Sequence, residues 1–323
     1  MSTFQKATKK NVRARVAFDG PSGSGKTWTA LEWATVLGQK IAVADTERGS
    51  ASLYADRFSF DVLEFSPPFH PDRLVEAIKS AEKAAYDVLI IDSLSHFWEG
   101  EGGVLDIADA AGSRAGGNSW AGWKSATPAL RHLIDTILAS DLHIIVTMRS
   151  KTEWTQEEDT DSKGHRKSRP VRLGMAPVMR QGTEYEMTIV GDLDLEHRLT
   201  ITKSRCDALS DLVVQPGRAG EAAETFLNWT QSGAEAASRN DIDAPKAQLN
   251  RLDPEVRKPA KEAFVAEFGN PDFLLASKLE AARALVAGYA TPGFVDEAGR
   301  IHVPEGEDAV VYKMELKADA PDA

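Results

Sequence analysis

The sequence predicts an α/β fold in which helices flank a mostly parallel sheet, followed by a small C-terminal helical unit. Strand-like and helix-like stretches alternate from residue 13 to about residue 230, a pattern typical of parallel sheets covered on both faces. Residues 20–27, Gly-Pro-Ser-Gly-Ser-Gly-Lys-Thr, fit the phosphate-binding loop pattern G-x-x-x-x-G-K-[ST]. Residues 87–92, Asp-Val-Leu-Ile-Ile-Asp, form an apolar run that ends in an acid, as expected of a buried parallel strand.

The composition is that of an ordinary globular protein. The chain has 323 residues, 42% of them hydrophobic and 27% charged, which predicts one large domain and a smaller one. Cys206 is the single cysteine, so an internal disulfide and a cysteine-based zinc site are excluded, which fits a reducing cytosol. No apolar run approaches the roughly 18 residues of a spanning helix. The lysines of residues 1–11 have no apolar segment behind them, so we expect a cytoplasmic protein with no membrane partner.

The net charge of −11 bears on nucleic-acid binding. It argues against indiscriminate binding of nucleic acid by the whole surface. A local basic groove stays compatible with this charge, because screening limits the reach of distant acidic groups to about 10 Å at ordinary salt.

The first predicted elements surround the phosphate-binding loop. Residues 13–18 read as a strand and residues 28–37 as a helix, and strand, loop and helix together form the context in which this pattern binds phosphate. We expect ATP with Mg²⁺ here, with Lys26 on the β- and γ-phosphates and the Thr27 hydroxyl on the metal. The residues expected to bind the nucleotide are Gly20, Pro21, Ser22, Gly23, Ser24, Gly25, Lys26, Thr27 and Trp28.

The remaining elements of the predicted core follow in chain order. Periodicity predicts strands at 39–45, 87–92 and 142–148, and helices at 71–85 and 128–140. Residues 185–190 and 197–203 alternate apolar and polar side chains and predict a hairpin or adjacent edge strands. Residues 99–124 and 155–181 lack a regular pattern and predict two long loops, which in a compact domain are usually functional or disordered.

The predicted domain organisation has five parts. Residues 1–12 form an N-terminal extension and residues 13–231 the core. Residues 232–246 form a linker. Residues 247–290 form a helical unit with helices at 253–268 and 271–289, and residues 291–323 contain a short hairpin around Gly299 and a flexible acidic tail.

Two acids are the candidates for the chemistry of hydrolysis. Asp92 ends a buried strand about 65 residues after the phosphate-binding loop, where such proteins place the carboxylate that holds Mg²⁺. The next residue is Ser93 rather than a glutamate, so the base that polarises water must come from elsewhere. Glu47 follows the strand 39–45, and the carboxyl ends of parallel strands line the ligand crevice. We expect Glu47 to be the base; the alternative is a capping acid in a loop.

The end of the strand 142–148 is the predicted site of a γ-phosphate sensor. Thr147 is the preferred contact to the γ-phosphate, against a plain hydrogen bond at the strand end. Arg149 or Lys151 could instead belong to a loop that moves with the nucleotide state.

Cations and tryptophans within the two irregular stretches predict a DNA-binding surface. A basic run downstream of the sensor strand could grip DNA phosphates or be a solvated surface loop. Tryptophans in the first stretch could stack on unpaired bases or pack against the sheet. The residues concerned are Lys163, Arg166, Lys167, Arg169 and Arg172, with Trp120, Trp123 and Lys124.

Lys203 and Arg205 lie at the end of a late strand with a spacing that points both side chains the same way. In an oligomer they could reach the nucleotide of a neighbouring subunit. The alternative is an edge strand protected by charge.

Together these features resemble a RecA-type ATPase core, and more closely the phage-encoded RecA-like ATPases of single-strand annealing and recombination. The resemblance covers about residues 13–210. Its more specific part lies in the loop signatures; the phosphate-binding loop and the strand-end aspartate are shared by many NTPases. The segments that carry it are 20–27, 45–51, 91–93, 118–124, 147–153, 174–177, 184–186 and 203–205.

The resemblance implies roles for several residues. Glu47 corresponds to the catalytic glutamate, Lys203 and Arg205 to the cationic pair that completes a neighbour's site, and the irregular stretches to DNA-binding loops. The chain departs from the family where Thr147-Met148-Arg149 replaces a sensor glutamine, and where no oligomerisation strand is evident before Val12.

Three functions remain open from the sequence. The first is an ATPase, stimulated by DNA, that binds single-stranded DNA and anneals or pairs strands as a homo-oligomer, in a bacterial cytoplasm if phage-encoded. The second is a helicase-loader-like accessory ATPase that binds a single-strand-binding protein or another replication or recombination factor. The third is a P-loop small-molecule or nucleotide kinase, with residues 163–172 as its lid.

Overall fold

The computed structural model describes residues 9–160, 166–233, 239–252, 254–268 and 276–290. The chain divides into two compact units. The larger is Arg13–Thr230, and the smaller joins Met1–Val12 to Gln231–Ala323. No helix in the described ranges is long and apolar enough to cross a membrane.

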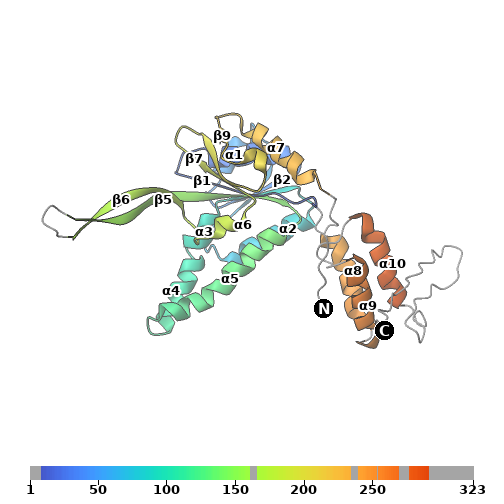
Figure 1. Ribbon diagram of the computed structural model, residues 1–323. Coiled ribbons are helices and arrows are strands. Elements are labelled where there is room, and N and C mark those ends of the chain that lie inside the picture. The colour runs from blue at the N-terminus through green and yellow to red at the C-terminus, as the bar shows by residue number, and fades with distance from the viewer. Residues whose placement is uncertain (1–8, 161–165, 234–238, 253, 269–275, 291–323) are drawn as a thin grey trace, which may run out of the picture. The chain divides into compact units, whose positions relative to one another are not determined.

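The larger unit is built on a nine-stranded sheet with the order β3-β2-β4-β5-β1-β7-β8-β9, and β6 pairs with β5 outside this path (Figure 1). The pairings from β3 to β7 are parallel, whereas β6, β8 and β9 join antiparallel. The predicted mostly parallel α/β fold is confirmed. The strands are β1 (Arg15–Gly20), β2 (Ile41–Asp45), β3 (Asp61–Glu64), β4 (Val88–Asp92), β5 (His143–Thr160), β6 (Arg166–Pro177), β7 (Ile189–Leu193), β8 (Leu199–Ser204) and β9 (Val213–Val214).

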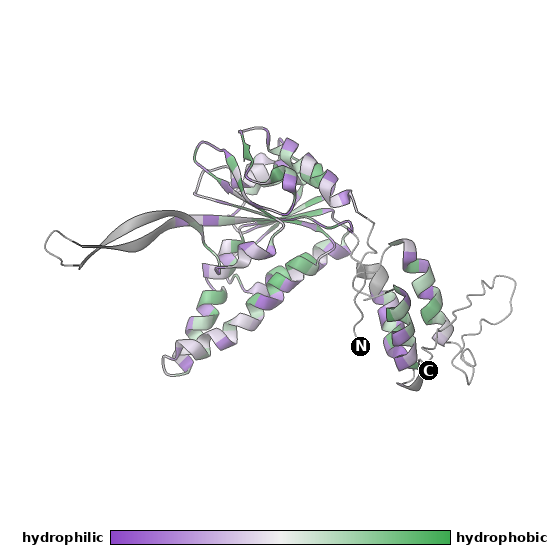
Figure 2. Ribbon diagram, in the orientation of Figure 1, coloured by the Kyte–Doolittle hydropathy of each residue, from purple (hydrophilic) through white to green (hydrophobic). Residues whose placement is uncertain are grey.

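Helices cover both faces of this sheet because its strands alternate side chains between two cores. On β1, Val16 and Phe18 join the core under α1 and α7, while Ala17 joins the core under α2, α3 and α5. Figure 2 shows the resulting concentration of hydrophobic residues along the central strands. The helices of this unit are α1 (Lys26–Leu37), α2 (Pro71–Lys83), α3 (Leu94–Glu99), α4 (Val104–Arg114), α5 (Ser119–Ala139), α6 (Thr183–Glu186) and α7 (Ala219–Gln231), with short 3₁₀ turns η1 (Ala51–Tyr54) and η2 (Asp207–Leu209).

The long loop predicted at residues 99–124 is wrong, because α4 and the first turns of α5 form a helical hairpin there (Figure 1). The Asn118 side chain caps α5 by accepting hydrogen bonds from the backbone N–H groups of Trp120 and Ala121, at 3.1 and 3.3 Å. A Cβ on Gly122 would lie 2.3 Å from the carbonyl oxygen of Ala108. The small residues that suggested a loop therefore allow two helices to pack closely. Pro128 lies inside α5 and does not begin a helix.

The second predicted loop, residues 155–181, is also wrong over most of its length. β5 continues to Thr160, and β6 returns antiparallel beside it, forming the arm that extends from the sheet in Figure 1. A two-stranded ladder takes its hydrogen bonds from the backbone, so it does not require the apolar alternation that marks a strand packed on a core. That alternation is absent from this part of the sequence.

The strand predicted at residues 185–190 begins later than expected. Residues Thr183–Glu186 form the short helix α6, and β7 starts at Ile189. The Lys203 ammonium on β8 donates hydrogen bonds to the backbone carbonyls of Glu184, Tyr185 and Met187, which holds this turn closed. The predicted partner strand 197–203 corresponds to β8.

The smaller unit contains three helices around a core that includes Leu249, Phe264 and Val286. The predicted helix 253–268 corresponds to α9. The segment 232–246 was predicted as a linker, but α8 begins within it. Leu249 near the end of α8, and Leu252 just after it, are buried in this core. The predicted hairpin around Gly299, the tail 291–323 and the start of the predicted helix 271–289 lie outside the described residues. The helices are α8 (Arg239–Arg251), α9 (Pro254–Phe268) and α10 (Leu279–Ala290), with the 3₁₀ turn η4 (Ala276–Lys278).

Candidate nucleotide-hydrolysis site

The candidate site lies at the carboxyl ends of four adjacent parallel strands, β2, β4, β5 and β1. β1 ends in the phosphate-binding loop, β2 is followed by Glu47, β4 ends at Asp92, and β5 carries Thr147 and Arg149. The sheet therefore brings together the residues that the sequence predicted for nucleotide and metal. In open α/β sheets, ligands bind at this edge.

The phosphate-binding loop has the geometry of an anion cradle. Gly20 has a φ of +156°, and a Cβ there would lie 2.5 Å from the Leu193 carbonyl oxygen, so only glycine fits between β1 and β7. The Ser24 hydroxyl is buried and has no hydrogen-bond partner in the described structure. The Lys26 ammonium donates to the carbonyls of Gly20 and Pro21, at 2.9 and 2.8 Å, as α1 begins. An unpaired buried hydroxyl, a lysine and a helix N-terminus in one loop fit a bound triphosphate.

Asp92 joins the two residues predicted to hold Mg²⁺ and the sensor strand. The Thr27 hydroxyl donates to Asp92 Oδ2 at 2.6 Å, and the Thr147 hydroxyl donates to Oδ1 at 2.5 Å. Burial raises the pKa of Asp92, and the two hydroxyl donors act in the opposite direction. A carboxylate beside a threonine hydroxyl suits Mg²⁺, which usually takes one or two protein oxygens in addition to phosphates and waters. Thr147, predicted to contact the γ-phosphate, orients the Asp92 carboxylate in this structure.

Glu47 forms a bidentate ion pair with Arg149. Arg149 Nε donates to Oε1 at 3.0 Å and Nη2 to Oε2 at 2.7 Å. Burial acts to raise the pKa of Glu47, but the hydrogen bond and charge of Arg149, together with the charges of His96 and Lys26, outweigh it and lower the pKa. A carboxylate with a lowered pKa and both oxygens occupied is a weak base. In this structure, therefore, both oxygens of the predicted base are held by Arg149.

Thr46 and His96 were missed by sequence reasoning and connect the ends of β2 and β4. The Thr46 hydroxyl accepts a hydrogen bond from the Ser93 backbone N–H at 2.7 Å and lies 2.6 Å from His96 Nδ1. His96 stacks on Phe69 with ring centroids 5.1 Å apart. Burial is the largest cause that lowers the pKa of His96, which favours the neutral ring beside Glu47 and Arg149. This network fixes the backbone on either side of the predicted base.

A pair of neighbouring acids, the buried Asp19 and the exposed Asp192, was also missed. They lie opposite each other on β1 and β7, and the Ser150 hydroxyl donates to Asp19 Oδ1 at 2.8 Å. Burial, followed by the charge of Asp192, raises the pKa of Asp19 to about 7, against the effects of Ser150 and Lys26. An acid in an otherwise apolar strand is a signal that could have identified Asp19, because buried carboxylates require an explanation.

We expect Asp19→Asn to stabilise the nucleotide-free protein at pH 8 and to have a much smaller effect at pH 4. The folded pKa of Asp19 lies above its unfolded value of about 3.9, so the stability of the wild type falls as pH rises from about 4 through 7. Asparagine carries no charge at any pH and removes this loss. Thermal melting at both pH values measures the effect, with Asp109→Asn on the exposed face of α4 as control. An equal shift in melting temperature at both pH values would contradict the assigned protonation.

The structure places the predicted intersubunit cations and Trp28 as follows. Lys203 donates to the carbonyls around α6, as described above. The Arg205 backbone N–H donates to the Thr188 carbonyl at 3.1 Å, while its exposed side chain makes no hydrogen bond or ion pair with the described residues. Trp28 packs edge-on against Tyr54 and Phe58, with ring centroids 5.5 and 4.9 Å away. Trp28 directly follows the phosphate-binding loop on α1, and 36% of its surface is exposed.

The predicted DNA-binding residues fall on two projecting hairpins. Trp120, with 74% of its surface exposed, and Trp123, with 38%, lie near the start of α5, and the Lys124 ammonium is 6.0 Å from the Trp120 ring. The backbone of Arg166, Lys167, Arg169 and Arg172 lies on β6. Lys163 lies outside the described residues. The sequence predicted that the basic run lies directly downstream of the sensor strand. In the structure, β5 continues from Thr147 and Arg149 into the arm in which it pairs with β6.

Comparison with protein families gives a match over most of the larger unit. The AAA domain family (AAA_24) matches residues 13–214, which contain the phosphate-binding loop, Glu47, Asp92 and every strand of the sheet. The matched span is more than half of the 323 residues. No protein with a curated description matches the chain. The chain therefore belongs to the AAA_24 family of AAA domains and is a P-loop nucleotide-binding ATPase.

Proposed function

We propose that this chain is a Mg²⁺-dependent ATPase that binds single-stranded DNA and promotes strand annealing or pairing as a homo-oligomer. By its resemblance, it would be a phage-encoded recombination protein acting in a bacterial cytoplasm. The observation that carries this proposal is the path of β5. Three of its residues, Thr147, Arg149 and Ser150, contact the carboxylates of Asp92, Glu47 and Asp19, and the same strand continues into the arm with β6.

The chemistry follows from the side chains at the edge of the sheet. Bound ATP with Mg²⁺ supplies the phosphoryl group that is transferred to water. Lys26 exchanges the carbonyls of Gly20 and Pro21 for phosphate oxygens, which are stronger acceptors for an ammonium. Thr27 and Asp92 hold the metal. Glu47 then polarises the attacking water once Arg149 has turned away from it.

Arg149 is the element that would make the arm respond to nucleotide. Arg149 lies on the strand that leads to the arm, and its guanidinium pairs with the Glu47 carboxylate. A bound phosphate could compete with Glu47 for this guanidinium, because both are good bidentate acceptors. The backbone carbonyl of Arg149 also accepts a hydrogen bond from the Val178 N–H at 2.6 Å, where the chain returns from β6. A change at Arg149 therefore reaches both strands of the arm, which is the property required of a nucleotide-sensitive DNA grip.

Neutralising Arg166, Lys167 and Arg169 together is expected to reduce the salt dependence of single-stranded DNA binding. Each lost phosphate contact lowers the slope of log K against log salt by about 0.7, so the slope should fall by about 2. Filter binding or anisotropy of a labelled oligonucleotide at several salt concentrations measures this.

The control variant neutralises three cations on α2 instead, and its salt slope should equal that of the wild type. These residues are Arg73, Lys79 and Lys83.

β6 pairs in register with a β5 segment that contains Glu157 and Asp159. If these acids already neutralise the cations, the slope of the triple variant will equal that of the wild type, and the arm is removed from the DNA path.

Annealing of two complementary labelled strands, with ATP and Mg²⁺ present, tests the proposed function itself. We expect the protein to accelerate annealing and to bind each strand before pairing. Absence of single-stranded DNA binding would overturn the proposal. Phosphorylation of an added small molecule would then support a kinase, and activity restored by a replication protein would support an accessory ATPase.

A further inference from the structure

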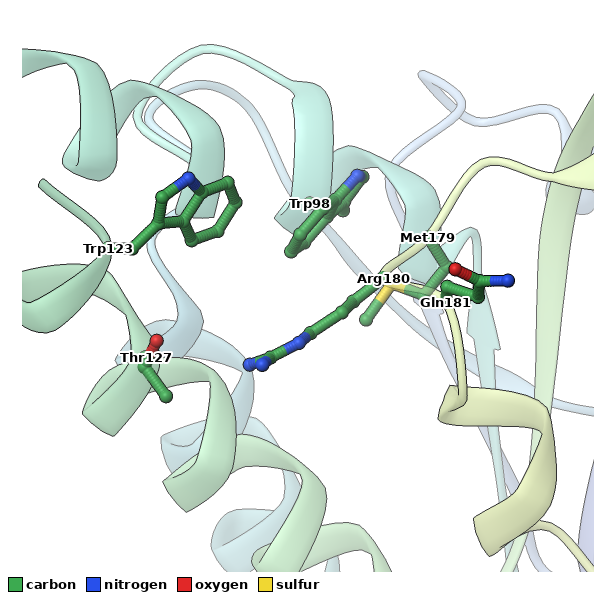
Figure 3. A pocket seen from close by; sticks show the side chains of 6 residues that line it. All are labelled: Trp98, Trp123, Thr127, Met179, Arg180 and Gln181. Atoms are coloured by element: carbon green, nitrogen blue, oxygen red, sulfur yellow. The ribbon is translucent and has the colours of Figure 1, made fainter. Parts of the chain in front are cut away.

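A pocket of about 310 Å³ lies between α3, α5 and the segment that follows β6 (Figure 3). Trp98 comes from α3, Trp123 and Thr127 from α5, and Met179, Arg180 and Gln181 from the segment after β6. Only Trp123 of these residues was among the sequence-predicted DNA-binding residues. The volume lies at the lower end of the range for sites that bind small molecules.

The aromatic part of the pocket consists of two nearly parallel indoles. The rings of Trp98 and Trp123 have centroids 5.8 Å apart and an interplanar angle of 26°. This separation places the rings offset rather than directly overlaid, so neither indole fully covers the other. Figure 3 shows both rings on the same side of the pocket, with open space between them and the side chain of Arg180. A flat aromatic ligand can therefore stack on an indole face.

The polar part of the pocket consists of groups without protein partners. The side chains of Thr127, Arg180 and Gln181 make no hydrogen bond to protein within the described part of the chain, although each carries strong donors. Arg180 extends beneath the indoles toward Thr127 (Figure 3). A guanidinium can bind a phosphate in bidentate fashion, and an amide and a hydroxyl can bind the edge of a base.

The pocket is connected to the nucleotide site on two sides. Trp98 lies on the short helix that directly follows Asp92 and β4. Met179 and Arg180 directly follow Val178, whose N–H is bonded to the Arg149 carbonyl. A ligand in the pocket would thus contact the helix that follows the Asp92 strand and the segment that is hydrogen-bonded to Arg149.

We propose that this pocket binds one unpaired base of a single strand, stacked on Trp98 or Trp123, with an adjacent phosphate on Arg180. The proposal rests on the single-stranded DNA binding proposed above and assigns a residue-level site for it. Stacking recognises the π-face common to all bases, so the pocket takes any base. A pocket for an aromatic ring next to a cation that has no partner matches a nucleotide better than an apolar peptide side chain.

The test compares the affinity of the full-length protein for oligo-dT with its affinity for an abasic strand of equal length. Trp98→Leu and Trp123→Leu are each expected to weaken oligo-dT binding by about 5- to 150-fold and to leave abasic binding unchanged. Trp229→Leu is the matched control, because Trp229 is also half-buried and stacked, on Phe226 at 5.8 Å, but lies on α7 and packs against the core on that face of the sheet. Arg180→Ala is expected to weaken binding of both strands, and Arg218→Ala, on the exposed surface before α7, to weaken neither.

Each outcome decides a different claim. If the wild type binds oligo-dT and both tryptophan variants bind it equally well, the pocket does not bind a base. The proposed function would then still stand. Equal losses on oligo-dT and on the abasic strand also overturn it, because they indicate altered folding rather than stacking. If the wild type binds neither strand, the proposed function fails, and the pocket assignment fails with it.

Discussion

Lys26→Ala is expected to abolish ATP hydrolysis and to weaken ATP binding. Lys26 is the one cation of the phosphate-binding loop, and its ammonium lies between the Gly20 carbonyl and the carboxylates at the end of the sheet. Burial lowers the pKa of Lys26, and the charges of Asp92 and Glu47 oppose this shift. Removing one preorganised charge donor from a transition state costs about 10²- to 10³-fold in rate.

Phosphate release and equilibrium nucleotide binding, measured on the same preparations, test this expectation. Lys79→Ala is the control, because Lys79 is exposed on α2. Full turnover by the Lys26 variant would show that the nucleotide is hydrolysed at another site. Loss of turnover with unchanged binding would restrict Lys26 to the chemical step.

Glu47→Gln is expected to retain ATP binding and to lower turnover by about 10²- to 10⁴-fold, the usual contribution of a positioned base. Glutamine keeps the shape of the side chain and can still accept one hydrogen bond from Arg149. It has no carboxylate with which to polarise water. The folded structure and the nucleotide pocket should therefore persist while the chemical step slows.

Steady-state turnover and nucleotide binding of Glu47→Gln, next to Glu76→Gln on the exposed face of α2, measure this effect. Normal turnover would falsify the role of Glu47 and transfer it to another acid of the sheet edge. Asp45 is then the nearest alternative, but both of its carboxylate oxygens accept backbone hydrogen bonds, from Glu47 and Ala51, and it holds the loop in place.

The sequence predicted best those parts of the fold whose local residue pattern follows directly from their position in the folded protein. The phosphate-binding loop needs its glycines wherever it occurs, and the apolar run before Asp92 is buried because its strand is central. The predictions for residues 99–124 and 155–181 failed where tertiary contacts override local pattern. Gly122 allows close helix packing in the first segment, and backbone pairing alone builds the second.

The pairing of side chains within the site was the least predictable feature. Arg149 and Glu47 are 102 residues apart, and Asp19 and Ser150 are 131 apart, so their contacts depend on strand order. The sequence predicted that Thr147 contacts the γ-phosphate because it ends a strand. Pattern alone could not show that the register of β4 and β5 also brings its hydroxyl to Asp92. Sequence pattern identified which groups reach the edge of the sheet, and the sheet order determines which of them meet.

The most direct test of the account is steady-state ATP hydrolysis with Mg²⁺, in the presence and absence of single-stranded DNA, with Lys26→Ala as the blank. Because β5 connects the partner of Glu47 to the arm with β6, we expect DNA to raise the turnover of the wild type and to have no effect on the Lys26 variant. Wild-type turnover that is identical with and without DNA, together with no measurable DNA binding, would contradict the account.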